Sequence, residues 1–378
     1  MSDNEELHPS RFIDQYKNYG RTESALQEER RVRLLEKQKQ SRQEELDAGR
    51  PGLLEELETH GDGPEDSMDC QDGQLQRGSK KRPKFITSKL FANKVQLSEW
   101  MHERPADLDS WFAVPCPVGQ RCLLVFRNRL AVAYNKRGRS IASIHTKLDH
   151  MRGTIVLDCV LAKNRVFYIL DALAFLQVDL VNCDCQFRFT WIESQFHEKN
   201  LAHQFNAKAT KEKGGFQLSL LPVYDLARPD SLERCWTRYP AFTDDSPRLD
   251  GFLFYHKQSH YVYGRTPLVT WLFPFMLNDV LKLPPGLVSE QYLVAKPASY
   301  TGDYAAYIKE FDRLQQLRKR RPRGKRGNAG QQMDTTTESV PDATLWEAME
   351  AAPLESDDED LRPREEDTMR ALEMEGCC

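Results

Sequence analysis

Residues 116–126 read CPVGQRCLLVF, a short turn that leads directly into an apolar strand. Gly119 and Arg121 stand close together where this strand begins. Glycine lets the backbone approach a bound group closely, and arginine is well suited to phosphate. The stretch therefore predicts a nucleotide-binding turn, in which Cys116 occupies the place where an enzyme would keep a reactive amine.

The region around this turn carries nearly all of the large apolar side chains. It runs from residue 84 to residue 300 and is long enough to bury a substantial core. Apolar spacing predicts helices at 87–101 and 185–199. Runs of β-branched and aromatic residues predict strands at 121–127, 129–135, 154–162 and 165–172 and a strand pair within 251–263. We therefore expect an α+β fold with a mostly antiparallel sheet.

One connection in this region predicts a hairpin. The runs 154–162 and 165–172 are separated by Lys163-Asn164 alone. Asparagine tolerates the left-handed conformation that tight turns need, so these two strands are expected to pair in an antiparallel manner.

The rest of the chain divides into polar segments. Residues 1–10 are expected to be disordered, 11–50 form a separate segment with a predicted helix at 22–46, and 51–83 are a linker rich in Gly, Asp, Glu and Pro. Residues 301–378 are predicted to be a mostly disordered tail. Within it lie a basic run at 318–326 and an acidic run at 354–376.

Composition excludes several classes of protein. No apolar stretch approaches the roughly 18 residues that a membrane span needs, and the N-terminus MSDNEELHPSRF lacks a signal-peptide pattern. The nine cysteines fit no zinc spacing. His256 and His260 lie in a segment that predicts a strand and loop, so we expect ordinary histidines there. We therefore expect a cytoplasmic or nuclear protein with no metal and no cofactor.

The segment 22–46 is rich in arginine and in residues that favour helices. It contains no Gly or Pro, and its few leucines and one valine are too sparse to bury a stable apolar stripe. Such a helix is marginal alone and gains order from an acidic partner surface. A solvated charged helix is the alternative interpretation.

This segment resembles the importin-β-binding segment of the importin-α and snurportin families. RFIDQYKNYG (11–20) matches its extended part, and ERRVRLLEKQKQSR (29–42) matches the basic helix that follows. The resemblance implies that importin β wraps around both parts. The residues that fall on the pattern are Arg11, Tyr16, Lys17, Arg30, Arg31, Arg33 and Lys39.

The middle region resembles the nucleotide-binding domain of covalent nucleotidyltransferases such as mRNA guanylyltransferases. CPVGQR (116–121) lies on the spacing of Lys-x-Asp-Gly-x-Arg, and LDCVL (157–161), FYILDAL (167–173) and DGFLF (250–254) resemble later motifs in the same order. Cys116 replaces the lysine that would attack a phosphate, and other carboxylates of the pattern are also missing. We therefore predict a nucleotide-binding frame without catalytic residues, in a protein that is not an enzyme.

A longer stretch narrows the resemblance to one family. Residues 250–277, which read DGFLFYHKQSHYVYGRTPLVTWLFPFML, are very similar to the snurportin family. LSEW (97–100) and YNKRG (134–138) match the same family in order. The resemblance implies that 84–300 is a domain that binds the 2,2,7-trimethylguanosine cap of spliceosomal small nuclear RNAs. The cap-binding residues that it implies are Trp271, Trp100, Leu97, Ser98, Cys116, Arg121, Lys136 and Val160.

The implied roles agree with the chemistry of the cap. Trp271 would stack on the positively charged base, which gains cation–π attraction. Trp100, Leu97 and Ser98 would lie beside the methyl groups on N2, where an apolar wall suits a base without N2 donors. Arg121 and Lys136 suit the triphosphate.

The resulting hypothesis is a nuclear import adaptor that carries small nuclear ribonucleoproteins into the nucleus and shuttles between cytoplasm and nucleus. The alternative is an active nucleotidyltransferase or cap-processing enzyme. The family also binds an exportin for recycling, but only MSDNEELHPS precedes the importin-β segment here, which leaves that contact open.

Overall fold

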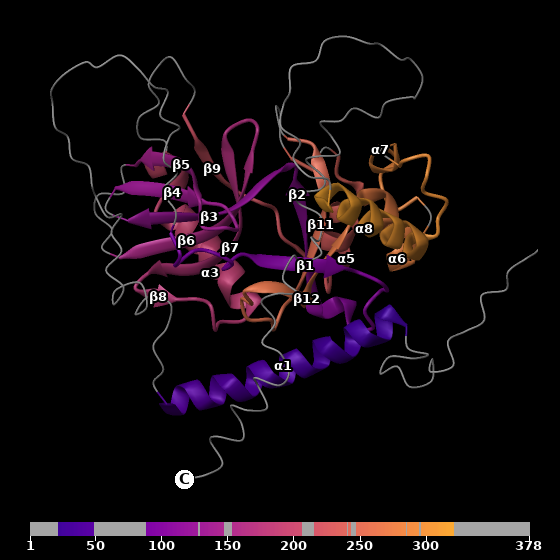
Figure 1. The fold of residues 1–378 in the computed structure, drawn as a ribbon, viewed down its shortest axis with the longest axis horizontal. Helices are drawn as coiled ribbons and strands as arrows, with labels where there is room; N and C mark the ends of the chain where they lie inside the picture. Colours follow the sequence, from indigo (N-terminus) through magenta and orange to yellow (C-terminus); the bar gives the residue numbers. More distant parts are fainter. Residues whose placement is uncertain are drawn as a thin grey trace, which may run out of the picture.

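The computed structural model confirms the α+β class and the mostly antiparallel pairing of the strands (Figure 1). It describes residues 22–48, 88–127, 129–146, 153–205, 215–239, 241–242, 247–284, 286–294 and 296–320. The predictions for 1–10, for the linker 51–83, for the acidic run 354–376 and for most of the basic run 318–326 lie outside these residues.

The larger of two sheets has seven strands. Their order is β5-β4-β3-β6-β7-β8, and β9 pairs with β7 on the side of β8. All pairs are antiparallel except β7 with β9. The strands are β3 (Gly119–Arg127), β4 (Leu130–Tyr134), β5 (Ser140–His145), β6 (Thr154–Ala162), β7 (Val166–Leu176), β8 (Val178–Asp179) and β9 (Gln217–Leu220).

The smaller sheet has five strands in the order β1-β12-β11-β2-β10. Its pairs are antiparallel except β1 with β12, which run parallel. The strands are β1 (Gln96–Trp100), β2 (Trp111–Pro117), β10 (Tyr224–Asp225), β11 (Leu249–His256) and β12 (Gly264–Leu272).

The chain passes from the smaller to the larger sheet at the stretch CPVGQR. β2 ends at Pro117, β3 begins at Gly119, and between them the Val118 N–H donates to the Arg248 carbonyl at 2.9 Å. A Cβ on Gly119 would lie 2.5 Å from the Leu161 carbonyl oxygen and 2.7 Å from a methyl of Val160. Glycine is therefore required here because β3 crosses so close to β6.

The predicted hairpin is confirmed, with a different residue at its turn. β6 and β7 pair in an antiparallel manner, but Arg165 takes the left-handed conformation, with φ 63°. The Asn164 side-chain oxygen instead accepts a hydrogen bond from the Val166 N–H at 3.3 Å. Asparagine thus stabilises the turn through its side chain rather than through its backbone.

The helix predicted at 185–199 is confirmed as α3 (Cys185–Glu198), which Asp184 caps by accepting from the Phe187 N–H at 2.8 Å. The helix predicted at 87–101 is wrong, because turns there lead into β1. Most residues of β1 are buried on both faces, so its apolar residues do not alternate and their spacing resembles that of a helix.

Further helices surround the sheets. α1 (Glu23–Ala48) confirms the predicted N-terminal helix and lies beside β12 and β1 as a long separate rod (Figure 1). The others are η2 (Leu108–Ser110), α4 (Leu201–Phe205), α5 (Pro229–Thr237), η3 (Pro274–Met276), α6 (Leu277–Leu281), α7 (Glu290–Leu293) and α8 (Tyr304–Arg320).

α8 lies in the first part of 301–378, the segment predicted to be a mostly disordered tail. Ile308 is buried in the core of the smaller sheet, and Tyr307 and Phe311 pack against the same core. These side chains recur at helical spacing, so the ordered domain extends to the end of α8.

A buried ion pair ties α3 to β7. Arg188 Nε and Nη2 donate to the two carboxylate oxygens of Asp171 at 2.8 Å each, and neither side chain is exposed. The remaining Arg188 nitrogen donates to the backbone carbonyls of Cys183 and Ser259. Burial lowers the pKa of Arg188, but the paired Asp171 more than offsets this and raises it, so the pair stays charged.

We expect Arg188→Met to destabilise the domain by about 3–5 kcal/mol, because it leaves the carboxylate of Asp171 buried without its partner. Urea unfolding measures the change. Arg234→Met is the matched control, since its pair with Asp230 is exposed and is worth about 0–1 kcal/mol. Equal small effects of both substitutions would contradict a structural role for the buried pair.

Candidate functional site

Four residues of the predicted site lie in one buried cluster. Trp100 on β1, Cys116 on β2, Val160 on β6 and Trp271 on β12 belong to the hydrophobic core between the sheets and helices. Trp100 and Trp271 pair in register, and Cys116 pairs with Gly251 on β11. The fold thus brings together residues that are up to 171 positions apart in the sequence.

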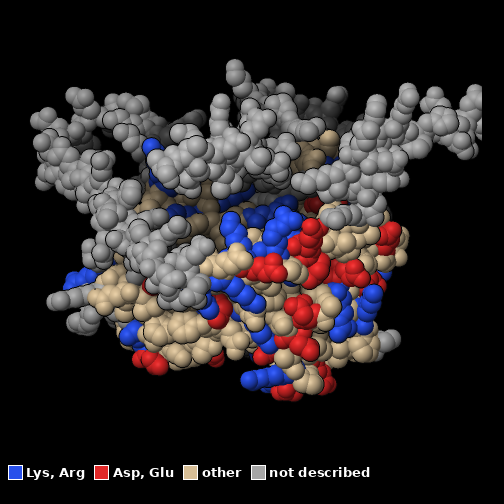
Figure 2. Space-filling model, turned by 90° about the horizontal axis from the view of Figure 1, so that it is seen from below, with Lys and Arg blue, Asp and Glu red and all other residues tan. Residues whose placement is uncertain are grey.

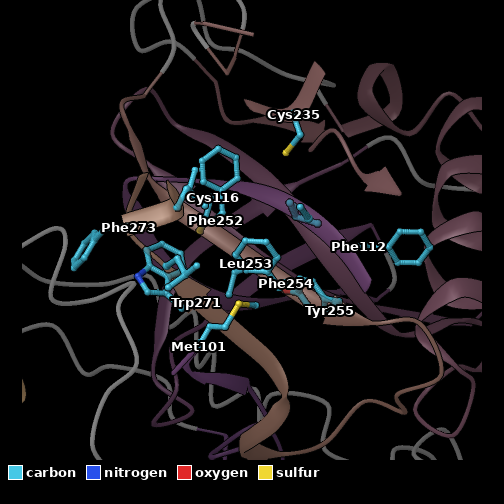
Figure 3. Packing of buried hydrophobic residues seen from close by; sticks show 14 of the residues in the cluster. Met101, Phe112, Cys116, Cys235, Phe252, Leu253, Phe254, Tyr255, Trp271 and Phe273 are labelled. Atoms are coloured by element: carbon cyan, nitrogen blue, oxygen red, sulfur yellow. The ribbon is translucent and has the colours of Figure 1, made fainter. Parts of the chain in front are cut away.

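Trp271 is fully buried and packs on the backbone of β11. A Cβ on Gly251 would lie 2.4 Å from its Cζ2 atom, so only glycine leaves room for this ring. Figure 3 shows Trp271 beside Leu253 and Met101, with Phe273 farther along. The indole N–H has no hydrogen-bond partner. Stacking of a base on this ring therefore requires the groups around it to move.

Trp100 is held by α8, a helix outside the predicted site. Its indole Nε1 donates to Asp312 Oδ1 at 3.0 Å. Phe311 meets the ring edge-on with 5.4 Å between centroids, and Phe273 lies at 5.5 Å. Trp100 is therefore packed among aromatic rings, and residues of the C-terminal region hold it in place.

The thiol of Cys116 lies in an environment that disfavours its thiolate form. Its side chain is 2% exposed, and its Sγ lies 3.8 Å from the Pro117 carbonyl oxygen. Burial raises the pKa of the thiol far above its usual range, and Asp250 raises it further, while Arg121 acts in the opposite direction. Only a thiolate attacks effectively, so covalent catalysis at the position of the missing lysine is disfavoured.

Arg121 and Val160 face each other across β3 and β6. Arg121 donates from Nε and Nη2 to the two carboxylate oxygens of Asp158 at 2.6 and 2.8 Å. Its side chain is 18% exposed, whereas that of Asp158 is fully buried. Burial lowers the pKa of Arg121, but Asp158 raises it well above the ordinary value, so the guanidinium is always charged.

Lys136 lies apart from the buried cluster, on the exposed turn between β4 and β5. The turn is held to the segment before β1, where the Asn93 N–H donates to the Lys136 carbonyl and the Ser88 N–H donates to the Gly138 carbonyl, both at 2.8 Å. A Cβ on Gly138 would lie 2.1 Å from the Ser88 carbonyl oxygen, and its φ is +70°. The turn is thus fixed in position at the edge of the domain.

Leu97 and Ser98 lie on β1, the strand that also carries Trp100. Leu97 packs against a second buried cluster that contains Leu123 and Tyr261, and Ser98 is buried. The β1–β12 register shifts between Ser98 and Glu99, where Ser98 pairs with Thr266 and Glu99 with Thr270. Pro267 lies in this bulge and cannot donate to the ladder.

α1 docks beside this wall through two of the arginines predicted to bind importin β. Arg30 donates to both carboxylate oxygens of Glu99, at 2.5 and 2.8 Å. Arg31 is buried, donates to the Pro267 carbonyl at 3.4 Å, and lies over the Trp111 ring at 4.8 Å. Gln27 adds hydrogen bonds to Glu99 and to the Trp100 carbonyl.

Two other predicted residues of this segment, Arg33 and Lys39, have exposed side chains. Arg33 pairs with Glu29 at 3.2 Å. Arg11, Tyr16 and Lys17 lie outside the described residues. Seen from the side of α1, the visible described surface has Lys and Arg interspersed with Asp and Glu (Figure 2). This face of the molecule is therefore of mixed charge.

Five residues that hydrogen-bond to side chains in and around the predicted site were not predicted from the sequence: Glu99, Asp158, Tyr261, Asp312 and Asp107. Glu99 lies within the motif LSEW and Asp158 within LDCVL. Their position in these motifs was the one signal that could have identified them as site residues. Asp107 accepts from Trp111 Nε1 at 3.1 Å and lies 3.2 Å from His256 Nε2. The hydrogen bond to His256 lowers the pKa of Asp107 to about 2.

His256 is thus held by the carboxylate of Asp107. Among the described residues, no group of three or more His, Cys, Asp or Glu side chains is arranged so that it could bind a metal ion. None of the helices in the described ranges has the length and apolar character needed to span a bilayer.

Comparisons with known proteins match two separate parts of the chain. Residues 94–274 match the family model described as "Snurportin1, m3G cap-binding domain", and residues 8–50 match the model described as "Snurportin1". Together they cover the described helix α1 and nearly all of both sheets.

Solved structures also resemble the chain. The ligase domain of M. tuberculosis LigD is 14% identical over 47% of this chain and 59% of its own, with a TM-score of 0.31. Mycobacterial DNA ligase D complexed with ATP and MES is 15% identical over 47% of this chain and 60% of its own, with a TM-score of 0.31. The chain thus spans about three fifths of these ligases, and a likeness of this degree supports no statement about activity.

The matched parts define a two-part protein, with a helical N-terminal segment ahead of a two-sheet domain of the cap-binding class. The chain belongs to the snurportin family.

We expect Cys116 to resist alkylation, because a thiol with a raised pKa has little thiolate at pH 8. Iodoacetamide labelling followed by peptide mass spectrometry should show Cys116 reacting on the order of 100-fold more slowly than a free cysteine peptide. Cys183, which is only partly buried, is the internal control. Labelling of Cys116 as fast as Cys183 would mean that its thiolate is accessible after all.

Proposed function

We propose that this protein is a nuclear import adaptor that binds the 2,2,7-trimethylguanosine cap of spliceosomal small nuclear RNAs and binds importin β. The observation that carries the proposal is the match of two snurportin models, in order, to the N-terminal segment and to the two-sheet domain. An adaptor of this kind carries small nuclear ribonucleoproteins into the nucleus and shuttles between nucleus and cytoplasm.

The cap would bind between β1, β3 and β12. Trp271 supplies the stacking surface, and base–aromatic stacking is worth about 1–3 kcal/mol. Trp100 and Leu97 form an apolar wall for the N2 methyl groups, which leave no donors for a polar site to satisfy. Arg121 lies next to Val160 and offers its exposed edge to the phosphates. Because the Trp271 ring is fully buried, the side chains that cover it must move away before a cap base can stack on it.

The alternative of a nucleotidyltransferase is not favoured by the site. The group at the position of the attacking lysine is a buried thiol whose pKa is raised by its burial. A cap that is bound there would be released unchanged.

Importin β would bind the segment that contains α1. In the structure two of the arginines on this helix contact the domain, Arg30 at Glu99 and Arg31 at Pro267. Importin β would therefore compete with β1 and β12 for these side chains. Recycling by an exportin would involve residues before Arg11, which lie outside the described residues.

We expect Trp271→Leu to weaken binding of a trimethylguanosine cap analogue about 5- to 150-fold, the loss of one base-stacking contact. Fluorescence titration with trimethyl and monomethyl analogues measures the change, and the unmodified protein should prefer the trimethyl form. Importin β binding should be unchanged.

Trp236→Leu is the matched control, because Trp236 is equally buried and its indole N–H is equally without a partner. Equal loss of cap binding in both variants would mean that Trp271 acts only through stability. An unmodified protein that prefers the monomethyl analogue would overturn the proposed function.

We expect Glu99→Gln to strengthen binding of importin β by about two- to fivefold, because it removes an ion pair worth about 0.5–1 kcal/mol at a half-exposed arginine. Surface plasmon resonance with the full chain measures the affinity. Glu103→Gln is the control, since Glu103 is exposed and close in sequence. No change for Glu99→Gln would show that this contact does not limit importin β binding.

A further inference from the structure

A continuous series of buried hydrogen bonds joins the two sheets inside the candidate site. Arg121 on β3 is held by Asp158 on β6 through two hydrogen bonds. The Tyr261 hydroxyl donates to Asp158 Oδ2 at 2.6 Å. The same hydroxyl accepts the Gln96 N–H at 2.9 Å, and Gln96 is the first residue of β1.

We propose that Asp158 and Tyr261 are positioning residues for cap recognition, which set the distance between Arg121 and the wall on β1. This inference rests on the proposed function. Neither residue touches the cap. They act through Arg121, which faces the phosphates, and through Leu97, Ser98 and Trp100, which face the methylated base.

The hydroxyl of Tyr261 has a role that no apolar ring can take. It donates its single proton to Asp158 and accepts from Gln96 with an oxygen lone pair, so both of its hydrogen-bonding functions are used. Gln96 is 1% exposed, and without this oxygen its N–H would have no solvent to replace the partner.

Asp158 controls the orientation of the guanidinium. The aspartate is fully buried and binds one edge of the group through Nε and Nη2, whereas 18% of the arginine side chain stays accessible. A bidentate pair fixes the plane of a guanidinium as well as its position. The rest of the guanidinium is therefore held in one fixed orientation.

Tyr261 is itself rigidly held. Its N–H donates to the Val181 carbonyl at 2.9 Å, and the Arg188 guanidinium lies 5.9 Å from its ring. Arg188 also donates to the Ser259 carbonyl, two residues earlier. The ring packs in the cluster against which Leu97 lies. A shift of the hydroxyl would thus reach β1 through both a hydrogen bond and a packing contact.

The test compares Tyr261→Phe with the unmodified full-length protein in binding trimethyl and monomethyl cap analogues. We expect the affinity for the trimethyl analogue to fall about tenfold. The trimethyl-over-monomethyl preference should fall as well, by roughly threefold, because the wall and the phosphate contact lose their fixed separation. A partly unfolded sample lowers the amount of competent protein but leaves this ratio unchanged, so the ratio separates positioning from stability.

Tyr263→Phe is the matched control, because Tyr263 lies two residues away and is 40% exposed. It should bind both analogues as the unmodified protein does. Asp158→Asn is the second variant and keeps the shape of the side chain. It should reproduce the loss of affinity and of preference, which keeps the proposal testable if Tyr261→Phe does not fold.

Unchanged affinity and preference in Tyr261→Phe or in Asp158→Asn would overturn the positioning role while leaving cap binding intact. Failure of the unmodified protein to bind the trimethyl analogue would instead overturn the proposed function. The two failures are therefore distinguishable within the same titration.

Discussion

Two aspartates lie side by side on the inner face of the larger sheet, and the arrangement of the domain depends on how their charges are neutralised. Asp158 and Asp171 pair in register across β6 and β7 and are both fully buried. Each carboxylate is held by two hydrogen bonds from one arginine, Arg121 or Arg188. Two unpaired carboxylates buried side by side would repel each other and lose their hydration, so they could not both stay ionised. The arginines come from β3 and α3, so the two ion pairs link β3 to β6 and α3 to β7.

Much of this arrangement was predictable from local pattern. β6 and β7, their hairpin and α3 follow from short-range signals, namely strand-forming runs, a tight connection with Asn164 and the apolar spacing of 185–199. The aromatic residues of the candidate site were proposed from their motifs, and the fold brings Trp100, Cys116, Val160 and Trp271 into one cluster. Gly119 was correctly singled out as a close approach of backbone, although the neighbour that requires it is β6. These features are determined by residues that lie close together in the sequence, so they could be predicted from a single sequence.

The rest depends on contacts between distant residues. The partner of Arg121 is 37 positions away, that of Trp100 is 212 positions away on α8, and that of Arg30 is 69 positions away on β1. β1 resembled a helix because it is covered on both faces, which only the tertiary structure decides. The full burial of Trp271 likewise follows from Gly251 and the surrounding chains and not from its own neighbours in the sequence. Patterns of local spacing contain no information about such pairs.

β1 is the element on which these distant contacts converge. Gln96 is fixed by Tyr261, Glu99 by Arg30 of α1, and the indole of Trp100 by Asp312 of α8. Three separate parts of the chain therefore hold a strand of five residues, which also carries Leu97 and Ser98. A strand moves as a unit because its residues share one hydrogen-bonded ladder. Any ligand that displaces Trp100 must thus act against the contact between Glu99 and α1, and any partner that removes α1 changes the support of Trp100. The geometry of β1 makes the wall of the candidate site and the docking site of the N-terminal helix two sides of the same strand.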